Sequence, residues 1–202
     1  MSEIVQASNP MAARFHSKEL SSDTWQDFAR LFEKHGGVWG GCYCMYYHTT
    51  QGWSRRSARQ NEEEKELLVQ AGKSHGILVY DDDTEQPVGW CQFGPREELP
   101  RIERKRGYKA AGEDSLWRVT CFFIDKEHRK RGVAREALRA ALEVMRREGA
   151  KNVEAYPLET IRERYSSSFL WAGTKHLFFQ FGFRQTRKLG KTLVMSKRIS
   201  AS

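Results

Sequence analysis

No segment of this sequence approaches the roughly 20 consecutive apolar residues that a membrane-spanning helix requires. The first residues carry Glu3 and no continuous apolar core segment, so we expect no signal peptide. Cysteine is scarce, with four residues at positions 42, 44, 91 and 121 of 202. We therefore expect a reduced, cytoplasmic protein with no membrane partner.

Internal repeats and low-complexity linkers are missing as well, and 202 residues are enough for one domain with a substantial core. We expect a loose N-terminal segment over residues 1–12 and a single domain over residues 13–202. With 39% hydrophobic and 12% aromatic residues, the chain is too apolar to be disordered throughout. The formal net charge of +8 favours anionic partners such as nucleotide phosphates, acidic peptides or nucleic acid.

Metal-ligand spacing is also missing, although Cys42, Cys44 and His48 are close together in the sequence. Cys-x-Cys is tighter than the spacing of common zinc sites, and no second Cys/His pair follows it. Three consecutive aspartates at residues 81–83 lack the spacing and the closing glutamate of an EF-hand loop. We therefore expect no metal site.

The most informative stretch runs from Trp117 to Gly149. The apolar residues 121–124 predict a strand that is buried on both faces, and apolar pairs spaced four apart from Val133 to Met145 predict an amphipathic helix. Between them lies Arg-Lys-Arg-Gly-Val-Ala, residues 129–134. Unpaired N–H groups at the helix N-terminus, the helix dipole and three cations together predict a phosphate site. The Gly-Lys-Ser/Thr of a Walker loop and the three glycines of a dinucleotide fingerprint are both missing.

The rest of the chain alternates between strand and helix patterns. The order predicts an α/β fold with a largely antiparallel sheet, and a parallel strand pair where the helix after residue 133 crosses over. We expect Leu67, Leu68 and Val69 to form the apolar side of an otherwise exposed helix. The predicted strands cover residues 13–20, 76–80, 88–93, 117–124, 152–157, 183–189 and 192–199, and the predicted helices residues 22–34, 54–74, 133–148 and 173–180.

Arg-x-x-Gly-x-Ala at residues 129–134, directly after a buried strand, resembles the acyl-CoA pyrophosphate loop of the GNAT superfamily of N-acetyltransferases. Val88-Gly89-Trp90 after a hairpin is similar to the third strand of that family, and residues 177–183 are similar to its late Leu-Tyr-x-x-x-Gly-Phe signature. The resemblance is close over residues 76–199 and holds only in outline over residues 13–75. It implies a GNAT-like fold, with a mixed, mostly antiparallel central sheet flanked by helices.

The resemblance further implies an acetyl-CoA-dependent N-acetyltransferase, an acyltransferase that moves an acetyl group to a primary amine by direct attack in a ternary complex. Acetyl-CoA, the acyl donor, would lie along residues 121–124, with a backbone N–H near Phe122 or Phe123 stabilising the oxyanion. The residues implied in donor binding are Phe122, Phe123 and Ile124 for the pantetheine arm, Arg129, Lys130, Arg131, Gly132, Val133 and Ala134 for the pyrophosphate, and Phe178 near the departing thiolate.

The usual catalytic acid and base of the family cannot be carried over. Phe178 occupies the place of a tyrosine that protonates the thiolate in many members, and Arg118 lies in a region where some members have a glutamate. Glu154 and Tyr156, which share one strand face, are the candidates for deprotonating the amine, and Tyr165 is a candidate acid. An ordinary exposed strand carboxylate is an equally weighted interpretation of Glu154.

Several alternatives stay open from the sequence. A non-catalytic acyl-CoA-binding regulatory domain is the second hypothesis, and a nucleic-acid module based on the basic residues 101–109 ranks last, so we expect no nucleic-acid partner. Residues 38–48 are either a core segment or, by the family resemblance, a wall of the acceptor pocket. The apolar surroundings of Cys91 and Cys121 predict inert buried thiols. The identity of the amine and the presence of a homodimer are left open.

Overall fold

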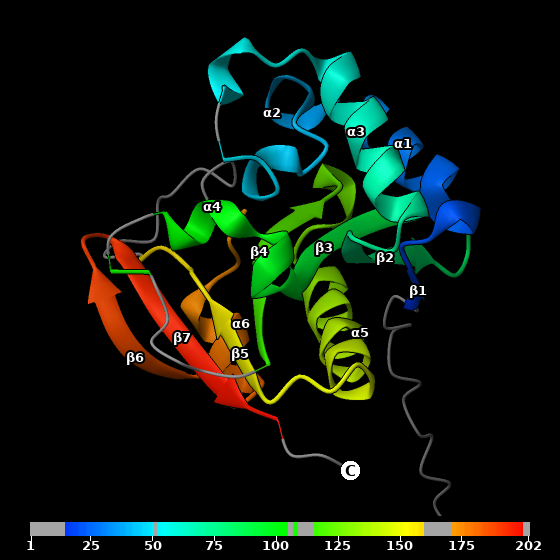
Figure 1. The fold of residues 1–202 in the computed structure, drawn as a ribbon. Helices are drawn as coiled ribbons and strands as arrows, with labels where there is room; N and C mark the ends of the chain where they lie inside the picture. Colours follow the sequence, from blue (N-terminus) through cyan, green and yellow to red (C-terminus); the bar gives the residue numbers. More distant parts are fainter. Residues whose placement is uncertain (1–14, 51, 105–106, 109–114, 160–170, 200–202) are drawn as a thin grey trace, which may run out of the picture.

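The computed structural model describes residues 15–50, 52–104, 107–108, 115–159 and 171–199. Its centre is a seven-stranded sheet in the order β1-β2-β3-β4-β5-β7-β6 (Figure 1). All neighbouring strands are antiparallel except β4 and β5, which confirms the predicted α/β class and the parallel pair at the crossover helix. The strands are β1 Phe15–Glu19, β2 His75–Asp81, β3 Pro87–Pro95, β4 Leu116–Ile124, β5 Asn152–Ala155, β6 Arg184–Leu189 and β7 Thr192–Arg198.

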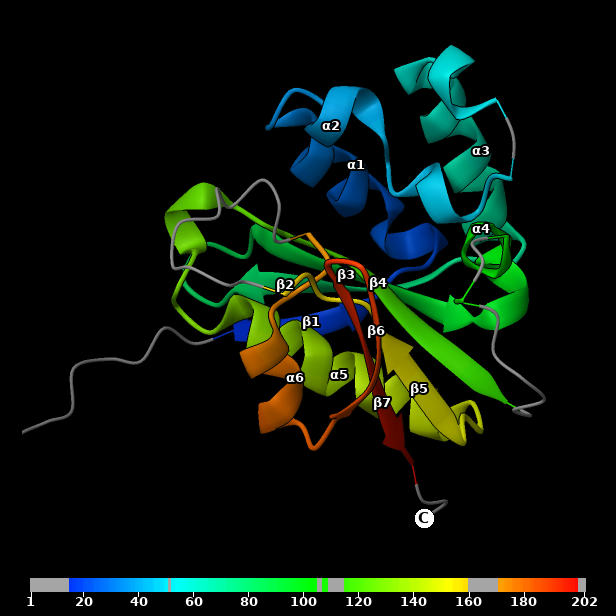
Figure 2. The same ribbon diagram turned by 90° about the vertical axis from the view of Figure 1, so that its left-hand side faces the viewer.

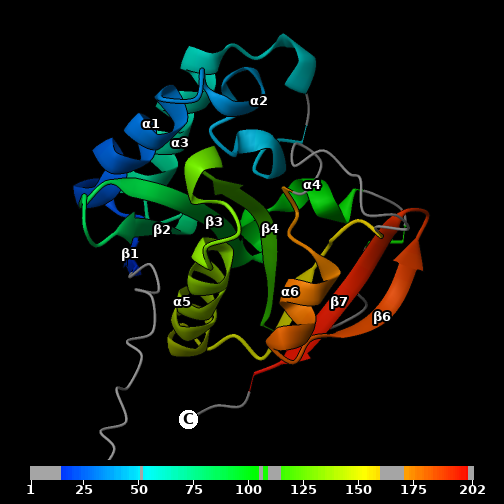
Figure 3. The ribbon, with the colours of Figure 1, turned by 180° about the vertical axis from the view of Figure 1, so that it is seen from behind.

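Helices cover both faces of this sheet (Figure 2). The first face carries α1 Trp25–Glu33, α2 Val38–Gly41, α3 Ala58–Gln70 and the short α4 Pro100–Glu103, and the opposite face carries α5 Val133–Arg147 and α6 Lys175–Gln180 (Figure 3). In the described parts of the chain, no helix is both long and apolar enough to cross a membrane. Short 3-10 turns lie at η1 Ser22–Thr24, η2 Met45–Tyr47, η3 Trp53–Arg55, η4 Arg96–Glu98 and η5 Lys126–His128.

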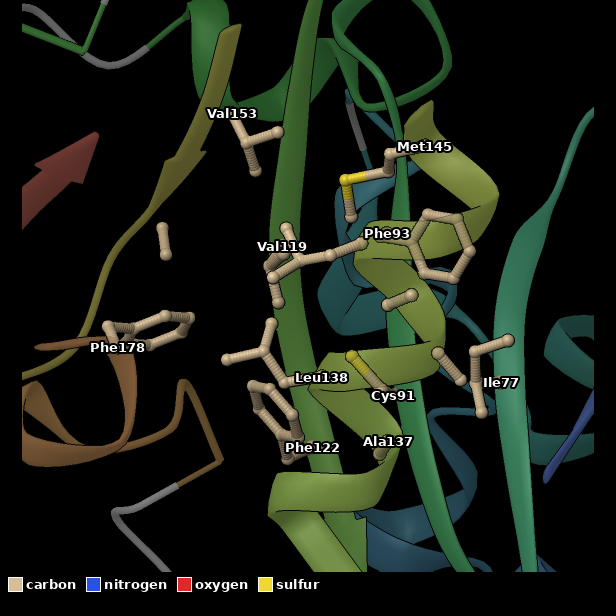
Figure 4. Close-up of a cluster of buried hydrophobic side chains, with 14 of the residues drawn as sticks. Ile77, Cys91, Phe93, Val119, Phe122, Ala137, Leu138, Met145, Val153 and Phe178 are labelled. Carbon is tan, nitrogen blue, oxygen red and sulfur yellow. The ribbon is translucent and has the colours of Figure 1, made fainter. Parts of the chain in front are cut away.

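The helix α5 provides the main core, as its apolar stripe predicts. Leu138 and Met145 are fully buried against β2, β3 and β4, together with Phe93 and Val119 (Figure 4). Burying one such side chain contributes about 1.5–3 kcal/mol to folding. The end of β4 and the start of α5 are thereby fixed relative to each other, which positions the loop between them.

The helix α3 differs from its prediction. Its apolar residue Leu67 is 62% exposed, and the buried face is instead formed by Asn61, Lys65 and Val69. These three residues are spaced four apart, so they lie on one side of the helix. Two of them are polar and have hydrogen-bond partners inside the protein, and Asn61 donates to the Gly41 carbonyl at 2.9 Å. Tertiary contacts rather than apolar patterning therefore orient α3.

Residues 38–48 form the short helix α2 and the 3-10 turn η2. Cys42, Tyr43, Cys44, Met45 and Tyr47 are all buried, so the prediction that this segment packs into the core is confirmed. The tight path of the chain requires left-handed backbone conformations, which glycine adopts without strain.

The connection between β3 and β4 contains the basic cluster that motivated the nucleic-acid hypothesis. Arg101 donates from Nε to the Tyr46 carbonyl at 2.5 Å and from Nη2 to the Thr49 hydroxyl at 2.8 Å. Arg104 donates to the Thr50 carbonyl at 2.7 Å. These two guanidinium groups hold the connection against residues 46–50. The other basic residues of the cluster, 105, 106 and 109, lie outside the described part of the chain.

Candidate functional site

The strand β4 is paired on both sides over only part of its length. Residues 116–119 pair in parallel with β5, and within the described residues this pairing goes no further than Val119. A β-bulge then interrupts the pairing with β3, because Gln92 lies opposite Cys121 whereas Phe93 lies opposite Val119. Thr120 is the extra residue. Beyond it, one edge of β4 is available to partners other than β5.

The bulge also decides which side chains of β4 face which layer. Val119 and Phe122 both belong to the core under α5, whereas Cys121 and Phe123 pack with the core under α1. Strict alternation would place Val119 and Cys121 on the same face, so the extra residue Thr120 shifts the alternation by one position. Cys121 therefore points to the side of the sheet opposite α5.

A cavity of about 840 Å³ opens along this edge of β4. We call the lining residues within 128–135 and 173–180 the basic wall, and the lining residues within 32–44 together with Cys121 the thiol wall. The volume of the cavity lies within the ~300–1,000 Å³ of typical ligand pockets. The lining residues are Phe32, Val38, Cys42, Cys44, Cys121, Phe122, Phe123, Ile124, His128, Arg129, Lys130, Gly132, Val133, Ala134, Arg135, Trp171, Gly173, Thr174, His176, Leu177 and Gln180.

The basic wall presents the N-terminus of α5 to the cavity. Gly132 caps the helix with φ of 96° and no side-chain hydrogen bond, and its carbonyl accepts the N–H groups of Arg135 and Glu136. The N–H groups of Val133 and Ala134 precede these first helical bonds and have no intrahelical acceptor. A Cβ on Gly132 would meet no protein atom within 4 Å. The loop therefore has both the orphan donors and the open space that a bulky anion needs.

The three cations of this loop do not share one direction. Arg129 and Lys130 line the cavity. Arg131 instead lies over the Phe15 ring, 5.8 Å from its centroid, with Nη2 3.9 Å from the Asp81 carboxylate. Two of the three predicted phosphate-binding side chains are therefore at the cavity, and the third is turned toward β1 and β2.

Asp125 anchors the junction between β4 and this loop. Its buried carboxylate accepts Lys34 Nζ at 2.6 Å and the Glu127 N–H at 3.1 Å, and it lies 3.4 Å from His35 Nε2. Burial alone would raise the pKa of Asp125, but the Lys34 and Glu127 hydrogen bonds outweigh it and lower the pKa to about 2. The ionised carboxylate thus ties the loop to the end of α1.

The free edge of β4 is partly occupied by the chain itself. The Phe122 N–H donates to the Trp171 carbonyl at 2.6 Å, whereas the Asp125 N–H on the other edge donates to the Val88 carbonyl of β3 at 2.9 Å. By alternation, the Phe123 N–H also points toward β3, and the Ile124 N–H points toward the cavity. Of the two N–H groups named for the oxyanion, one is therefore held by Trp171 and the other faces β3.

Phe178 is placed in the core rather than on the cavity wall. It is fully buried, and its ring lies 6.1 Å from that of Phe122 and 5.1 Å from that of Phe183 (Figure 4). Gly173 packs against both Phe122 and Phe178, because a Cβ there would approach their rings to 3.1 and 2.9 Å. Phe178 thus supports the wall of the cavity from behind.

The predicted catalytic pair Glu154 and Tyr156 are adjacent, as alternation on one strand face predicts. The Tyr156 hydroxyl donates to Glu154 Oε2 at 2.8 Å, and Arg187 Nη2 donates to Oε1 at 2.8 Å. Both residues are buried, so Glu154 is not the exposed carboxylate that the sequence left open. Burial raises the pKa of Tyr156. Neither residue is among those that line the cavity, and the third candidate, Tyr165, lies outside the described residues.

A buried polar network behind the thiol wall was not anticipated. The Nζ of Lys65 lies 3.1 Å from His48 Nε2, and Gln92 Nε2 lies 2.9 Å from the same atom. His48 Nδ1 lies 2.8 Å from the Glu98 carbonyl, which can only accept, so Nε2 is the acceptor for both donors. Burial lowers the pKa of Lys65 to about 8. Its position in a run of charged residues gave no signal of burial.

The cysteines differ from the prediction in one case. Cys91 is fully buried, as expected, and burial raises the pKa of its thiol. Cys121, however, is only half-buried and lines the cavity together with Cys42 and Cys44, which corrects the prediction of an enclosed thiol. The bulge at Thr120 is the reason, since it turns Cys121 away from α5. Among the described residues, no group of three or more His, Cys, Asp or Glu residues has the geometry of a metal site.

Several solved structures share this architecture. No curated protein matches the sequence. Among solved structures, the PaiA N-acetyltransferase from Thermoplasma acidophilum in complex with coenzyme A is 12% identical with a TM-score of 0.54, covering 92% of this chain and 99% of that one. A GCN5-related N-acetyltransferase from Kribbella flavida is 16% identical with a TM-score of 0.54, covering 92% and 98%.

A third structure is that of yncA from Salmonella typhimurium with its cofactor acetyl-CoA. It is 14% identical with a TM-score of 0.53, and the match covers 93% of this chain and 95% of that one. At such identities these structures establish the fold alone. The family model for the acetyltransferase (GNAT) family matches residues 24–165, which is more than half of the 202 residues. The chain therefore belongs to the acetyltransferase (GNAT) family.

Proposed function

We propose that this protein transfers an acetyl group from acetyl-CoA to a primary amine by direct attack in a ternary complex. The observation that carries the proposal is the N-terminus of α5, where Gly132 opens orphan N–H groups into a cavity along the free edge of β4. The pyrophosphate of the donor would be held by residues 129–134. Relatives of the same fold contain coenzyme A or acetyl-CoA, which supports this donor.

The rest of the donor follows from the shape of the cavity. The pantetheine arm would lie along residues 121–124, with the Ile124 N–H as one donor to it. The N–H of Phe122 becomes available only when the Trp171 carbonyl moves away, so donor binding is coupled to displacement of residue 171. Holding donor and amine together supplies much of the acceleration in such transfers.

Few residues of the described chain are candidates for accepting the proton of the amine. Glu154 is the carboxylate of β5 closest in sequence to the point where β4 and β5 separate, and Tyr156 is bonded to it. We propose this pair as the acceptor of the proton, through water, because neither group lines the cavity directly. Arg187 Nη2 donates to Glu154 Oε1 at 2.8 Å, which fixes the position of this carboxylate.

Binding of coenzyme A tests the donor site. Gly132→Glu places a negative charge and a Cβ at φ of 96°, and we expect it to abolish the CoA-induced rise in melting temperature. Gly149→Glu is the matched control, because Gly149 lies beyond the other end of α5 with φ of 80° and equally open space. Both variants carry a similar backbone penalty of about 1–2 kcal/mol, but only the first should lose binding. Calorimetry that detects no CoA binding to the unaltered protein would overturn the proposal.

A non-catalytic acyl-CoA-binding domain is the second candidate. It is favoured by Glu154, whose two oxygens are both engaged, and by Phe178 in place of a tyrosine. Release of free CoA thiol from acetyl-CoA that depends on an amine of a broad panel, and that continues beyond one equivalent per protein, would decide for the enzyme. CoA binding without thiol release across the panel would decide for the binding domain.

A further inference from the structure

Three of the four cysteines, Cys42, Cys44 and Cys121, line the same cavity as the phosphate loop. The Cys44 N–H donates to Cys42 Sγ at 3.5 Å, and the Cys121 thiol donates to the Phe122 carbonyl at 3.9 Å. The cluster joins two segments that are far apart in the sequence, α2 and its following turn on one side and β4 on the other.

The backbone that carries two of these thiols is strained. Tyr43 and Cys44 have φ of 41° and 53°, and Val38 has φ of 31°, although none of them is glycine. Such conformations cost on the order of 1–3 kcal/mol each and are retained where the surrounding structure fixes them, often at functional sites. Here the fixing contacts are hydrogen bonds from Trp90 Nε1 to Cys44 Sγ at 3.2 Å and from Gln92 Nε2 to the Cys44 carbonyl at 2.9 Å.

Within this cluster, Cys121 differs from the other two thiols. Cys42 and Cys44 are buried; the interaction with Cys44 together with burial raises the pKa of Cys42, and burial raises that of Cys44. Cys121 is half-buried and faces a cavity whose described charged lining is entirely basic: His128, Arg129, Lys130, Arg135 and His176. These cations give the cavity a positive field, and the partly exposed Cys121 is the thiol of the three that a ligand in the cavity can reach most readily. The buried cation of Lys65 lies behind the same cluster and adds to that field.

We propose that Cys121 is an S-acylation site, which takes the acetyl group of the bound donor when no amine is present. This inference rests on the proposed function, because the acyl thioester must reach the thiol wall while the loop holds the pyrophosphate. The Cys121 sulfur forms a bond to the acetyl carbonyl carbon, and the carbon–sulfur bond of acetyl-CoA breaks. The proton of the thiol ends on the released coenzyme A. One thioester replaces another, so no oxidant or reductant takes part.

The acetylated thiol occupies the place of the acceptor. Cys121 lies on the face of β4 opposite α5, where an amine would approach a donor held by the loop. A Cys121 thioester therefore fills the acceptor end of the cavity and delays the next transfer. The rate of labelling should fall when a competent amine is added, because the amine competes for the same acetyl group.

Intact-mass spectrometry of the full chain tests the proposal. The protein is incubated with acetyl-CoA and a phosphine reductant, and we expect one added acetyl group, located on Cys121 by peptide mapping and removed by neutral hydroxylamine. Cys121→Ala should abolish the hydroxylamine-sensitive label. Cys91→Ala is the matched control and should keep it, because Cys91 is fully enclosed on another strand. Protein unfolded in denaturant should lose the preference for Cys121.

Thermal shift with CoA, measured on the same samples, separates the two proposals. If CoA raises the melting temperature of the unaltered protein and of Cys121→Ala but no label appears on Cys121, S-acylation is wrong and the donor site stands. A label on Cys42 or Cys44 instead, or equal labelling after unfolding, also overturns it. If CoA gives no shift at all, the proposed function itself fails.

Discussion

The two walls of the cavity offer different chemistry to a ligand. The basic wall acts through charge and through the backbone N–H groups of one helix terminus, on a loop whose only left-handed residues are Lys130 and Gly132 within residues 128–135. The thiol wall has no charged side chain in its described lining, and its backbone is held in left-handed conformations by neighbours. Charge is screened by salt whereas shape is not. Donor binding should therefore depend on ionic strength far more than acceptor binding.

The largest expected effect is on the thiol wall. A Cβ on Gly41 would lie 2.2 Å from the Ala58 Cβ and 2.8 Å from its Cα, in a residue with φ of 81°. We expect Gly41→Ala to lower the free energy of unfolding by about 3 kcal/mol, from backbone strain and overpacking together. Gly40→Ala, with φ of 71° and no atom within 4 Å, should cost only about 1 kcal/mol. Urea unfolding of the two variants measures the difference, and equal losses would contradict a tight contact between α2 and α3.

The buried cation behind the thiol wall predicts a pH effect. The pKa of Lys65 falls from 10.5 to about 8 on folding, so the folded protein binds fewer protons than the unfolded chain between these values. The free-energy cost of burying the charged Lys65 side chain, on the order of 3 kcal/mol, is fully present below pH 8 and disappears as the pH rises toward 10.5. The unaltered protein should therefore gain stability relative to Lys65→Met over that range.

The difference between the two proteins is the quantity to measure. The buried thiol of Cys91, whose pKa is raised by burial, lowers the stability of both proteins in the alkaline range and cancels in the comparison. A difference that stays constant from pH 7 to about 10.5 would contradict the lowered pKa of Lys65, because the folded and unfolded chains would then bind the same number of protons at this residue.

An acid-range prediction concerns the basic wall. The pKa of Asp125 is lowered to about 2 from 3.8, so its contribution is present above pH 3.8 and is lost as the pH falls toward 2. Asp125→Asn should lower the free energy of unfolding at neutral pH by about 2 kcal/mol. This loss of stability should vanish when the pH falls to about 2, the lowered pKa of Asp125. Asp83→Asn, at an exposed position, is the control and should change little. Chemical denaturation at several pH values provides the test.

The smallest expected effect separates two neighbouring arginines of the loop. Arg129→Ala removes a cation that lines the cavity, and we expect CoA binding to weaken about tenfold, as for one charge-assisted contact. Arg131→Ala removes a side chain directed toward Asp81 and Phe15, and the change should stay within about twofold after salt screening. Calorimetry at two salt concentrations compares them. Equal losses would mean that Arg131 turns into the cavity when the donor binds.

The basic wall and the strand that precedes it could be predicted from the sequence because they depend on local rules. The strand, the glycine turn and the amphipathic stripe of α5 each follow from residues close together in the chain, and the structure has all three. Burial on both faces is not confirmed for the end of the strand, where Cys121, Phe123 and Ile124 are only partly buried. The family resemblance rested on the same residues, and the family is confirmed.

The thiol wall and the polar network behind it could not be predicted from the sequence because they depend on distant contacts. Lys65 lies in a charged run that is typical of an exposed face, yet it is buried because His48 and the Trp90 ring meet it from other segments. Cys121 lies in an apolar run that is typical of an enclosed strand, yet a bulge one residue earlier turns it to the cavity. A β-bulge has no reliable signature in a single sequence.

The uneven pairing of β4 has a consequence on the time scale of amide exchange. The N–H groups of residues 116–119 lie between two strands, so they should exchange with solvent only when much of the sheet opens. The Phe122 N–H is held by a single carbonyl from outside the sheet, and a local movement of Trp171 releases it. The same strand should therefore contain slowly and rapidly exchanging N–H groups a few residues apart. The exchange rate of the Phe122 N–H reports directly on whether the edge of the cavity is covered by the chain or by a ligand.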